Sequence, residues 1–433
     1  MSCITNHHKQ IDCQVTLPLS KSIVNRLLVI NHIAGNSSPV ELISDASDTK
    51  TMQLLLREIS SKSGNYITTT EINVGNAGTV MRFLTALLSV TPGKWHITGT
   101  ERMQQRPIQP LTDALQHLGA DLTFGKNSGF PPVYINGNLQ LDGGTVQLYA
   151  GISSQFISAL MMLGPVLKGG LTIELIGEVI SGSYIRMTQN LMQKCGAWVS
   201  FVDNRVVIEQ RNYTNIDFAK LLEPDWSAAA FWYEVAALAT DAKILLKGLH
   251  EQSVQGDSVL PQIYKSLGVN SVFTGEGLLI TKSGLLITDE FNYDFTECPD
   301  LAQAVIVTCA ALGIKGRFSG LKTLRVKETD RIAAIKNELV KLGYHVDVVE
   351  NRMVTFGNIP QNNDNSAQTI INCYDDHRMA MSFAPLALLH KNLCLDEPGV
   401  VRKSYPDFWK DLKKAGLLIN NGQLTMDNEK QKT

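Results

Sequence analysis

The sequence has little that would tie the chain to a membrane or to nucleic acid. The longest weakly polar run of its 433 residues, Leu301 to Ile314, contains Gln303 and is too short to span a bilayer. Lys and Arg together number 39 and Asp and Glu 41, so there is no overall basic field to attract a polyanion. We therefore expect neither a membrane nor a nucleic-acid partner, and an anionic ligand would need a local cluster of cations.

Closely spaced cysteine pairs are also missing. The seven cysteines form no C-x-x-C pair, and their number is odd. Met1 to Asp12 contains no apolar stretch of the kind that a signal peptide requires. These absences predict a reduced protein of the cytoplasm.

Several catalytic signatures are absent as well. The chain has no G-x-x-x-x-G-K-[ST] phosphate loop, no G-x-G-x-x-G and no G-x-S-x-G. ATP-dependent, dinucleotide-dependent and serine-hydrolase chemistry therefore lack their usual sequence support. No His or Cys spacing is typical of a zinc site, so we expect no metal.

What the sequence does have is an internal repeat. Five short helical patterns end in glycines that are 72 to 77 residues apart, at Gly119, Gly196, Gly268, Gly343 and Gly416. A glycine in this place predicts a left-handed residue just after the helix. A second series of apolar helices is predicted to begin near Ser22, Thr79, Ser154, Ser227, Leu301 and Arg378. Helices that are apolar on nearly all faces are buried helices.

The two series together predict an α/β fold of two lobes, each made of three repeated α/β units. We place the N-terminal lobe at residues 17–225 and the C-terminal lobe at residues 226–433. The sixth unit ends without a long final strand, so residues 1–16 are expected to complete the C-terminal lobe with a strand.

Cations lie where the apolar helices begin. Lys21, Arg26, Arg82 and Arg378 lie on or beside such helices, where the helix dipole opposes a positive charge in the first turn unless an anion lies beyond the terminus. The turn Asn76-Ala77-Gly78-Thr79 is typical of an anion nest and equally of a capped loop that enters a helix. The residue types alone leave both interpretations of this turn open.

Two charged segments are ambiguous by themselves. Arg325 to Arg331 is the densest, and Lys327 and Arg331 can project from one helical face with Glu328 beside them. Glu101 to Pro107 is a second cluster of cations. Such segments belong more often to a surface than to a site, and a lone histidine such as His377 is more often structural. The place of His377 between Asp376 and Arg378, at the start of a buried helix, makes it a candidate.

Taken in order, these segments resemble the family of 5-enolpyruvylshikimate-3-phosphate synthases. The similarity runs from Leu17 to Phe408, with anchors at 17–26, 75–82, 106–108, 153–156, 254–257, 325–331, 376–381 and 403–408. The resemblance implies the two-lobed enolpyruvyl transferase fold, with six α/β units and buried helices that point at the cleft between the lobes. It also implies transfer of the enolpyruvyl group of phosphoenolpyruvate to the 5-hydroxyl of shikimate 3-phosphate, in the shikimate pathway, by a monomer with no cofactor.

The resemblance assigns roles to the residues that match its motifs. Asp300 would be the base that faces the 5-hydroxyl, Glu328 the proton donor to C3 of phosphoenolpyruvate, and Lys21 and His377 would act beside them. The predicted shikimate 3-phosphate ligands are Lys21, Ser22, Arg26, Ser153, Ser154, Gln155, Ser181, Tyr184, Asp300 and Lys327. The predicted phosphoenolpyruvate ligands are Lys21, Asn76, Gly78, Arg82, Arg106, Gln155, Arg331, Arg378 and Lys403.

Three positions depart from the family pattern. Leu19 stands where glycine is frequent, Phe83 where proline is common, and Thr323 where an asparagine often contacts the substrate. Thr323 puts one polar contact in doubt. None of the three removes a predicted catalytic residue, so we expect an active enzyme.

Two other functions compete with this one. The sister enzyme that acts on UDP-N-acetylglucosamine usually carries a cysteine in the loop before its Arg-Pro pair, whereas this chain has no cysteine between Cys13 and Cys195. A noncatalytic phosphosugar-binding scaffold would be expected to lose Asp300, Glu328 or Lys21, and all three are present.

Overall fold

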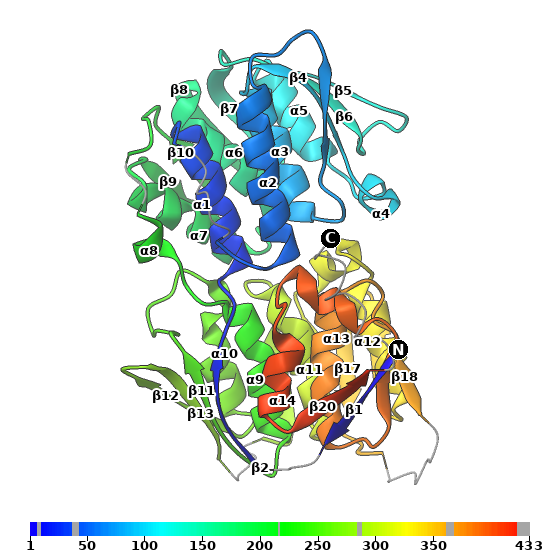
Figure 1. Cartoon of the computed structure of the whole chain (residues 1–433). Coiled ribbons are helices and arrows are strands. Elements are labelled where there is room, and N and C mark those ends of the chain that lie inside the picture. The colour runs from blue at the N-terminus through cyan, green and yellow to red at the C-terminus, as the bar shows by residue number, and fades with distance from the viewer. Residues whose placement is uncertain (7–9, 37–42, 215–216, 284–287, 361–367, 422–433) are drawn as a thin grey trace, which may run out of the picture.

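The structure is a computed structural model that describes residues 1–6, 10–36, 43–214, 217–283, 288–360 and 368–421. Within these residues the buried hydrophobic side chains form two separate cores. One core extends from Ile23 to Tyr213, and we call the region around it the N-terminal lobe. The other extends from Trp226 to Leu417 and includes Ile4, Ile11, Val15 and Leu17, and it defines the C-terminal lobe. Figure 1 shows the two lobes one above the other.

The N-terminal lobe combines helices with two four-stranded sheets, of order β3-β4-β6-β5 and β7-β8-β10-β9. Its helices are α1 (Lys21–Ile33), α2 (Ser47–Lys62), α3 (Gly78–Ser89), α4 (Glu101–Gln104), α5 (Gln109–His117), α6 (Ser154–Leu163) and α7 (Gly182–Lys194). Its strands are β3 (Thr69–Asn73), β4 (Gly93–Thr98), β5 (Asp121–Phe124), β6 (Val133–Gly137), β7 (Asp142–Tyr149), β8 (Lys168–Ile176), β9 (Val199–Val202) and β10 (Arg205–Ile208). The short helix α8 (Phe218–Leu221) precedes the crossing to the other lobe.

The C-terminal lobe has three four-stranded sheets, of order β12-β13-β11-β2, β14-β15-β17-β16 and β18-β19-β1-β20. Its helices are α9 (Trp226–Leu238), α10 (Leu260–Lys265), α11 (Ala302–Ala311), α12 (Arg331–Lys341), α13 (His377–Phe383) and α14 (Phe408–Lys414). Its strands are β1 (Ser2–Asn6), β2 (Gln10–Thr16), β11 (Asp241–Lys247), β12 (Val269–Thr274), β13 (Gly277–Lys282), β14 (Glu290–Asp294), β15 (Lys315–Ser319), β16 (Val346–Val349), β17 (Arg352–Phe356), β18 (Thr369–Ile371), β19 (Leu393–Leu395) and β20 (Leu417–Asn421).

The two predicted helix series are confirmed. The five repeat glycines follow α5, α7, α10, α12 and α14 with φ between 79° and 94°, the left-handed region that glycine enters without strain. The apolar series begins at Lys21, Gly78, Ser154, Trp226, Ala302 and His377. Every residue of α9 and of α11 is buried, as their all-apolar faces predict. The described residues form five four-stranded sheets, and α1 and α2 have no sheet of their own among them, so the six-unit repeat stays a prediction.

The first two strands of the chain pair with strands from its second half. Strand β1 lies antiparallel to both β19 and β20, and β2 lies parallel to β11 along its whole length. The chain then enters the N-terminal lobe beside the segment by which it later leaves. Ser20 N donates to Glu223 O at 2.8 Å, and Asp225 N donates to Pro18 O at 2.8 Å. Two adjacent extended segments therefore connect the lobes (Figure 1).

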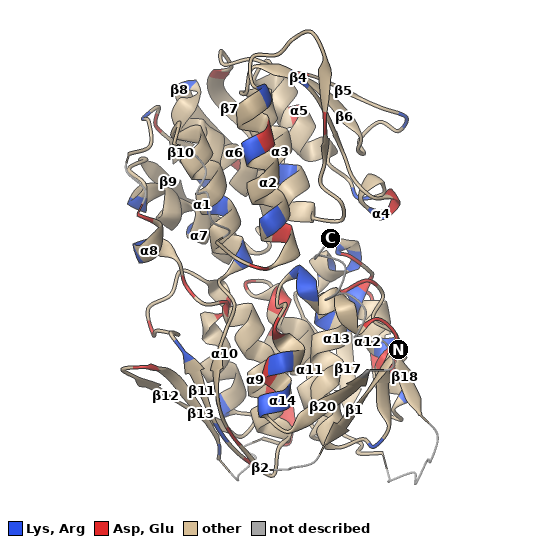
Figure 2. Cartoon of the chain, in the orientation of Figure 1, with Lys and Arg blue, Asp and Glu red and all other residues tan. Residues whose placement is uncertain are grey.

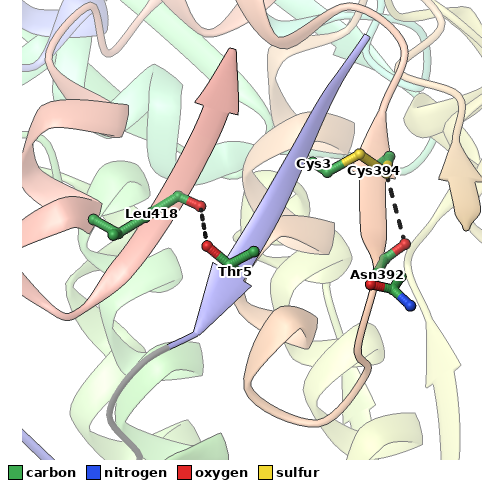
Figure 3. Close-up of a disulfide and its surroundings, with 5 residues drawn as sticks. All are labelled: Cys3, Thr5, Asn392, Cys394 and Leu418. Carbon is green, nitrogen blue, oxygen red and sulfur yellow. Dashed lines mark hydrogen bonds between the residues drawn. A yellow bond between two sulfur atoms is a disulfide. The ribbon is translucent and has the colours of Figure 1, made fainter. Parts of the chain in front are cut away.

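The expectation that all cysteines are reduced is wrong for one pair. Cys3 on β1 and Cys394 on β19 face each other in the sheet and form a disulfide, drawn in Figure 3. On the other edge of β1, the Thr5 hydroxyl donates to Leu418 O of β20 at 3.4 Å. Sequence spacing could not reveal this pair, because 391 residues separate the two cysteines and only the sheet brings them together. The other five cysteines are free.

The disulfide predicts a thiol count. In denaturant without reductant, the chain should show five thiols that react with a chromogenic disulfide reagent, because Cys3 and Cys394 are bonded to each other. After reduction it should show seven. A count of seven before reduction would contradict the disulfide. The Cys3→Ser variant is the control for the assignment, because it frees Cys394 and should show six thiols before reduction.

Candidate active site

A cavity between the two lobes is lined by most of the candidate residues. The N-terminal lobe supplies Lys21, Ser22, Arg26, Gly78, Arg82, Arg106, Ser153, Ser154, Gln155, Ser181 and Tyr184. The C-terminal lobe supplies Asp300, Lys327, Glu328, Arg331, His377 and Arg378. Of the predicted site residues, Asn76 and Lys403 instead line a second cavity next to the first. Figure 2 shows charged residues at the facing ends of the lobes, while the interior helices are mostly uncharged along their length.

Two buried arginines on the N-terminal side have incomplete hydrogen bonding. Arg82 and Arg106 are 4% and 6% exposed. Arg82 donates to Gly78 O at 3.1 Å and to Pro107 O at 3.2 Å, but its Nε has no partner among the described residues, nor do Nε and Nη1 of Arg106. Burial is the largest cause that lowers the pKa of each side chain. The positive charge of Arg106 lowers the pKa of Arg82 further. Because an unpaired buried cation is costly, this pair favours an anionic ligand.

Gly78 leaves the space that the Arg106 side chain occupies. A Cβ atom on Gly78 would lie 2.7 Å from both Nη1 and Nη2 of Arg106, which is closer than such atoms approach. Gly78 is also the first residue of α3 and lines the cavity, so the helix N-terminus, whose first N–H groups have no partner within the helix, lies at the cavity with the two arginines. The structure therefore favours the anion nest over the merely capped loop.

The two cations of α1 have different surroundings. Lys21 Nζ lies 3.0 Å from Asp48 Oδ2 of α2. Arg26 is held within its own lobe, since it donates to Thr188 Oγ1 at 2.7 Å and to Ser158 Oγ at 3.0 Å. Burial lowers the pKa of Arg26 to about 10. Lys21 thus has more freedom to turn toward a ligand, whereas Arg26 forms part of the cavity wall.

Hydroxyl and amide groups line the side of the cavity near α6 and α7. Ser153 caps α6 by accepting from Gln155 N at 3.3 Å, and Gln155 Nε2 donates to Thr79 Oγ1 at 3.1 Å. Ser181 precedes α7 with φ 61°, a left-handed conformation, and its N–H donates to Thr296 O of the other lobe at 2.8 Å. These groups can bind a polyhydroxylated ligand.

Asp300 is surrounded by donors from both lobes. Its carboxylate accepts from the Tyr184 hydroxyl at 2.6 Å and lies 3.2 Å from Arg378 Nη2 and 3.3 Å from Arg331 Nη1. Lys327 Nζ lies 3.9 Å away. Burial alone would raise the pKa of Asp300, but Arg378, Lys327 and Arg331 outweigh it and hold the pKa below its usual range. Asp300 is therefore an ionised carboxylate, and its lowered pKa makes it a weak proton acceptor while these cations surround it.

Glu328 is also ionised in this structure. Its carboxylate lies 3.0 Å from Lys403 Nζ and 3.0 Å from Arg331 Nη2. Burial opposes ionisation, yet Lys403, Arg331 and Arg106 together hold the pKa of Glu328 well below its ordinary value. A proton donor in this place needs added negative charge nearby, which an anionic substrate would bring.

His377 is neutral. It is 2% exposed, and burial, followed by the charge of Lys21, holds its pKa well below the ordinary value. Its Nδ1 has no hydrogen-bond partner among the described residues. A neutral imidazole in the cavity wall can donate or accept one hydrogen bond to a ligand.

Asn76 and Lys403 bind each other across the lobes. Lys403 Nζ donates to Asn76 O at 3.1 Å, and Asn76 Nδ2 donates to Asp375 Oδ2 at 2.8 Å. Lys403 reaches the main cavity only through its ion pair with Glu328. The motif match had placed both among the ligand-binding residues.

Some residues that line the cavity were not predicted. The structure also places the three residues that depart from the family pattern. Asp48, Asp225 and Ser227 line the cavity, and for Asp225 and Ser227 their place at the start of α9 was the available signal. Thr323 lines it too, with a buried hydroxyl that has no partner among the described residues. Phe83 lies beneath Arg26, whose Cζ is 5.3 Å from the ring centre. Leu19 forms an isolated antiparallel β-bridge with Pro224, between the two segments that connect the lobes.

The comparison with protein families decides the identification. The family model described as EPSP synthase (3-phosphoshikimate 1-carboxyvinyltransferase) matches residues 5–412. This chain belongs to that family. A 3-phosphoshikimate 1-carboxyvinyltransferase of Bacteroides fragilis (strain YCH46) is 44% identical over 415 residues, which cover 96% of this chain and 98% of that protein. One from Methanospirillum hungatei JF-1 is 34% identical and covers 92% of this chain and 94% of its own.

Solved structures agree on the architecture. An EPSP synthase of Acinetobacter baumannii superimposes with a TM-score of 0.71 at 22% identity, covering 98% of this chain and all of that one. The predicted family and the two-lobed EPSP synthase fold class are thus confirmed.

Within the described part of the chain, no helix is long and apolar enough to cross a membrane. The same residues contain no cluster of three His, Cys, Asp or Glu side chains suited to a metal ion.

Buried charge near Asp300 predicts a pH dependence of stability. Asp257 is 4% exposed and accepts from the Ser227 hydroxyl. Burial, and then the charge of Asp300, raise its pKa from 3.8 to about 7. Between these values folding takes up a proton, so this group lowers stability progressively as pH rises from about 4 to 7.

Asp257→Asn should remove that loss. Compared with the unchanged protein, the variant should gain unfolding free energy between pH 4.5 and 7, by at most about 1.4 kcal/mol per pH unit. Urea unfolding at several pH values measures the difference. A difference that does not change with pH would contradict the raised pKa.

Gly78→Ala should displace the Arg106 guanidinium, because the new methyl group would overlap it. We expect the KM for phosphoenolpyruvate to rise about tenfold or more, with a smaller change for shikimate 3-phosphate. Steady-state kinetics measure both constants. Gly275→Ala is the matched control, because a Cβ at Gly275 meets nothing within 4 Å. An equal rise in the KM values for phosphoenolpyruvate and shikimate 3-phosphate would argue against an anion site at Gly78.

Proposed function

We propose that this chain transfers the enolpyruvyl group of phosphoenolpyruvate to the 5-hydroxyl of shikimate 3-phosphate and releases phosphate. The observation that carries the proposal is the pair of buried, incompletely bonded guanidinium groups of Arg82 and Arg106, which face two ionised carboxylates across one cavity. Such a site needs anionic ligands and has two proton-transfer groups beside them. Membership of the family and the names of its relatives support the same reaction.

The charges divide between the two substrates. Arg82, Arg106 and the amides at Gly78 would bind phosphoenolpyruvate from the N-terminal lobe, and Arg331, Arg378 and Lys403 from the C-terminal lobe. Shikimate 3-phosphate would lie against the serines at the starts of α6 and α7, with Lys21 and Lys327 near both ligands. Bidentate pairing of guanidinium groups with phosphate or carboxylate would replace the bonds that the arginines lack.

Proton transfer follows from the two carboxylates. Asp300 accepts the proton of the 5-hydroxyl as the hydroxyl oxygen forms a bond to C2 of phosphoenolpyruvate. Glu328 gives a proton to C3. The Glu328 carboxylate then takes a proton back from C3 as the C2–oxygen bond to phosphate breaks, and the proton held by Asp300 passes to the departing phosphate, which gives the enol ether and free phosphate. The negative charge of the substrates opposes the effect of Lys403 and Arg331 on Glu328, so binding raises the pKa of its carboxyl toward the value that a donor needs.

We further propose that residues 17–225 act as one lobe, and residues 226–433 with residues 1–16 as the other, in a cytoplasmic monomer. Both walls of the cavity come from one chain, which supports a site that is complete without a second copy. In a reducing compartment the Cys3–Cys394 disulfide would be unusual, so the thiol count also bears on the location.

Phosphate release tests the proposed reaction. The purified chain should release phosphate from phosphoenolpyruvate only when shikimate 3-phosphate is present, and mass spectrometry should find the enolpyruvyl ether. Asp300→Asn should reduce the rate by about a hundredfold or more while the variant remains folded, because the base is lost. Release that depends on UDP-N-acetylglucosamine instead would assign the chain to the sister reaction. No release with either acceptor, while both ligands bind, would leave a binding protein.

A further inference from the structure

One contact between the lobes has a role that the proposed reaction does not assign. Arg102 of the N-terminal lobe donates from Nε to Glu328 O at 3.1 Å and from Nη2 to Lys327 O at 3.3 Å. Its guanidinium therefore bonds the backbone of two consecutive residues whose side chains line the opposite wall of the cavity. Arg102 itself does not line this cavity.

Arg102 is fixed to the phosphoenolpyruvate side of the N-terminal lobe. It lies on α4, where the Thr100 hydroxyl accepts from Met103 N at 3.3 Å and Thr100 N donates to Gly75 O at 3.0 Å. Met103 is fully buried, and its carbonyl accepts from Arg106 N at 3.1 Å. Backbone hydrogen bonds therefore link α4 to Arg106 and to the turn before Gly78. Figure 1 shows α4 at the edge of its lobe that faces the other lobe.

The residues that Arg102 holds occupy a short connection. Lys327 and Glu328 lie between a 3-10 turn (Lys322–Val326) and the start of α12 at Arg331. Their side chains point to different partners, since Lys327 Nζ lies 3.9 Å from Asp300 Oδ1 and Glu328 pairs with Arg331 and Lys403. A connection of this kind has few backbone bonds of its own to fix the direction of its side chains. Two hydrogen bonds to its carbonyl groups supply that restraint from the other lobe.

We propose that Arg102 is a positioning residue, which places Lys327 and Glu328 when the lobes are together. This inference rests on the proposed function, because it assigns Arg102 an effect on the residues of that reaction. The planar guanidinium can reach two neighbouring carbonyl oxygens at once, and a lysine ammonium at the same position cannot reproduce that fork. The bonds form only between lobes, so they act on the assembled site and not on either lobe alone.

Arg102→Lys and Arg102→Ala test the proposal in the full chain. We expect kcat to fall about 10- to 100-fold in both, because charged donors to two carbonyl groups are lost or misplaced. The Kd for shikimate 3-phosphate alone, measured by calorimetry, should change less than about threefold, since its predicted ligands lie mainly on the N-terminal lobe. Arg186→Lys is the matched control, because Arg186 also crosses between the lobes but pairs with Glu297, where both side chains are more than half exposed.

The outcomes separate this inference from the proposed function. If the unchanged chain shows no phosphate release that depends on shikimate 3-phosphate, the proposed function fails and this role fails with it. If the unchanged chain is active and both Arg102 variants keep kcat within about twofold of Arg186→Lys, Arg102 does not position the site. A loss of kcat in step with weaker shikimate 3-phosphate binding and a lower Tm would make Arg102 structural and overturn the proposal.

Discussion

The charge of Arg331 holds the C-terminal wall of the cavity together. Its side chain is 2% exposed and is paired with carboxylates from three separate segments, at 2.7 Å from Asp376, 3.0 Å from Glu328 and 3.3 Å from Asp300. Burial opposes its charge, but Asp376, Glu328 and Asp300 raise its pKa above the ordinary value. Removal of this guanidinium would leave three buried carboxylates close together without the cation that they share.

The two walls differ in electrostatic character. On the C-terminal wall acids and bases neutralise one another, whereas Arg82 and Arg106 on the N-terminal wall have no carboxylate bonded to them among the described residues. Phosphoenolpyruvate would therefore neutralise the cationic N-terminal wall and add negative charge beside the C-terminal wall, where the charges already neutralise one another. This asymmetry explains how a chain with a net charge of −2 can present a strongly cationic site to a small anion.

The sequence predicted much of the fold because its signals are local. Glycine after an amphipathic helix, and apolar residues on all sides of a helix, reflect short-range geometry, so the start of α9 and the end of α12 could be predicted. The site candidates came mainly from motif resemblance, and the structure brings nearly all of them to one cavity. Individual side-chain contacts between distant segments could not be predicted, since Cys3 meets Cys394 only in the assembled sheet of the C-terminal lobe, and Asn76 meets Asp375 only when both lobes are in place.

The place of β1 and β2 has a consequence for synthesis on the ribosome. The core of the N-terminal lobe runs without interruption from Ile23 to Tyr213, so it can assemble while the rest of the chain is still being made. The C-terminal lobe needs β1 and β2 from the first 16 residues and β20 from the region of Leu417. Strand β2 therefore waits until β11 has been made, and β1 waits until β19 and β20 have been made, so the lobe that carries Asp300 and Glu328 is the later one to form.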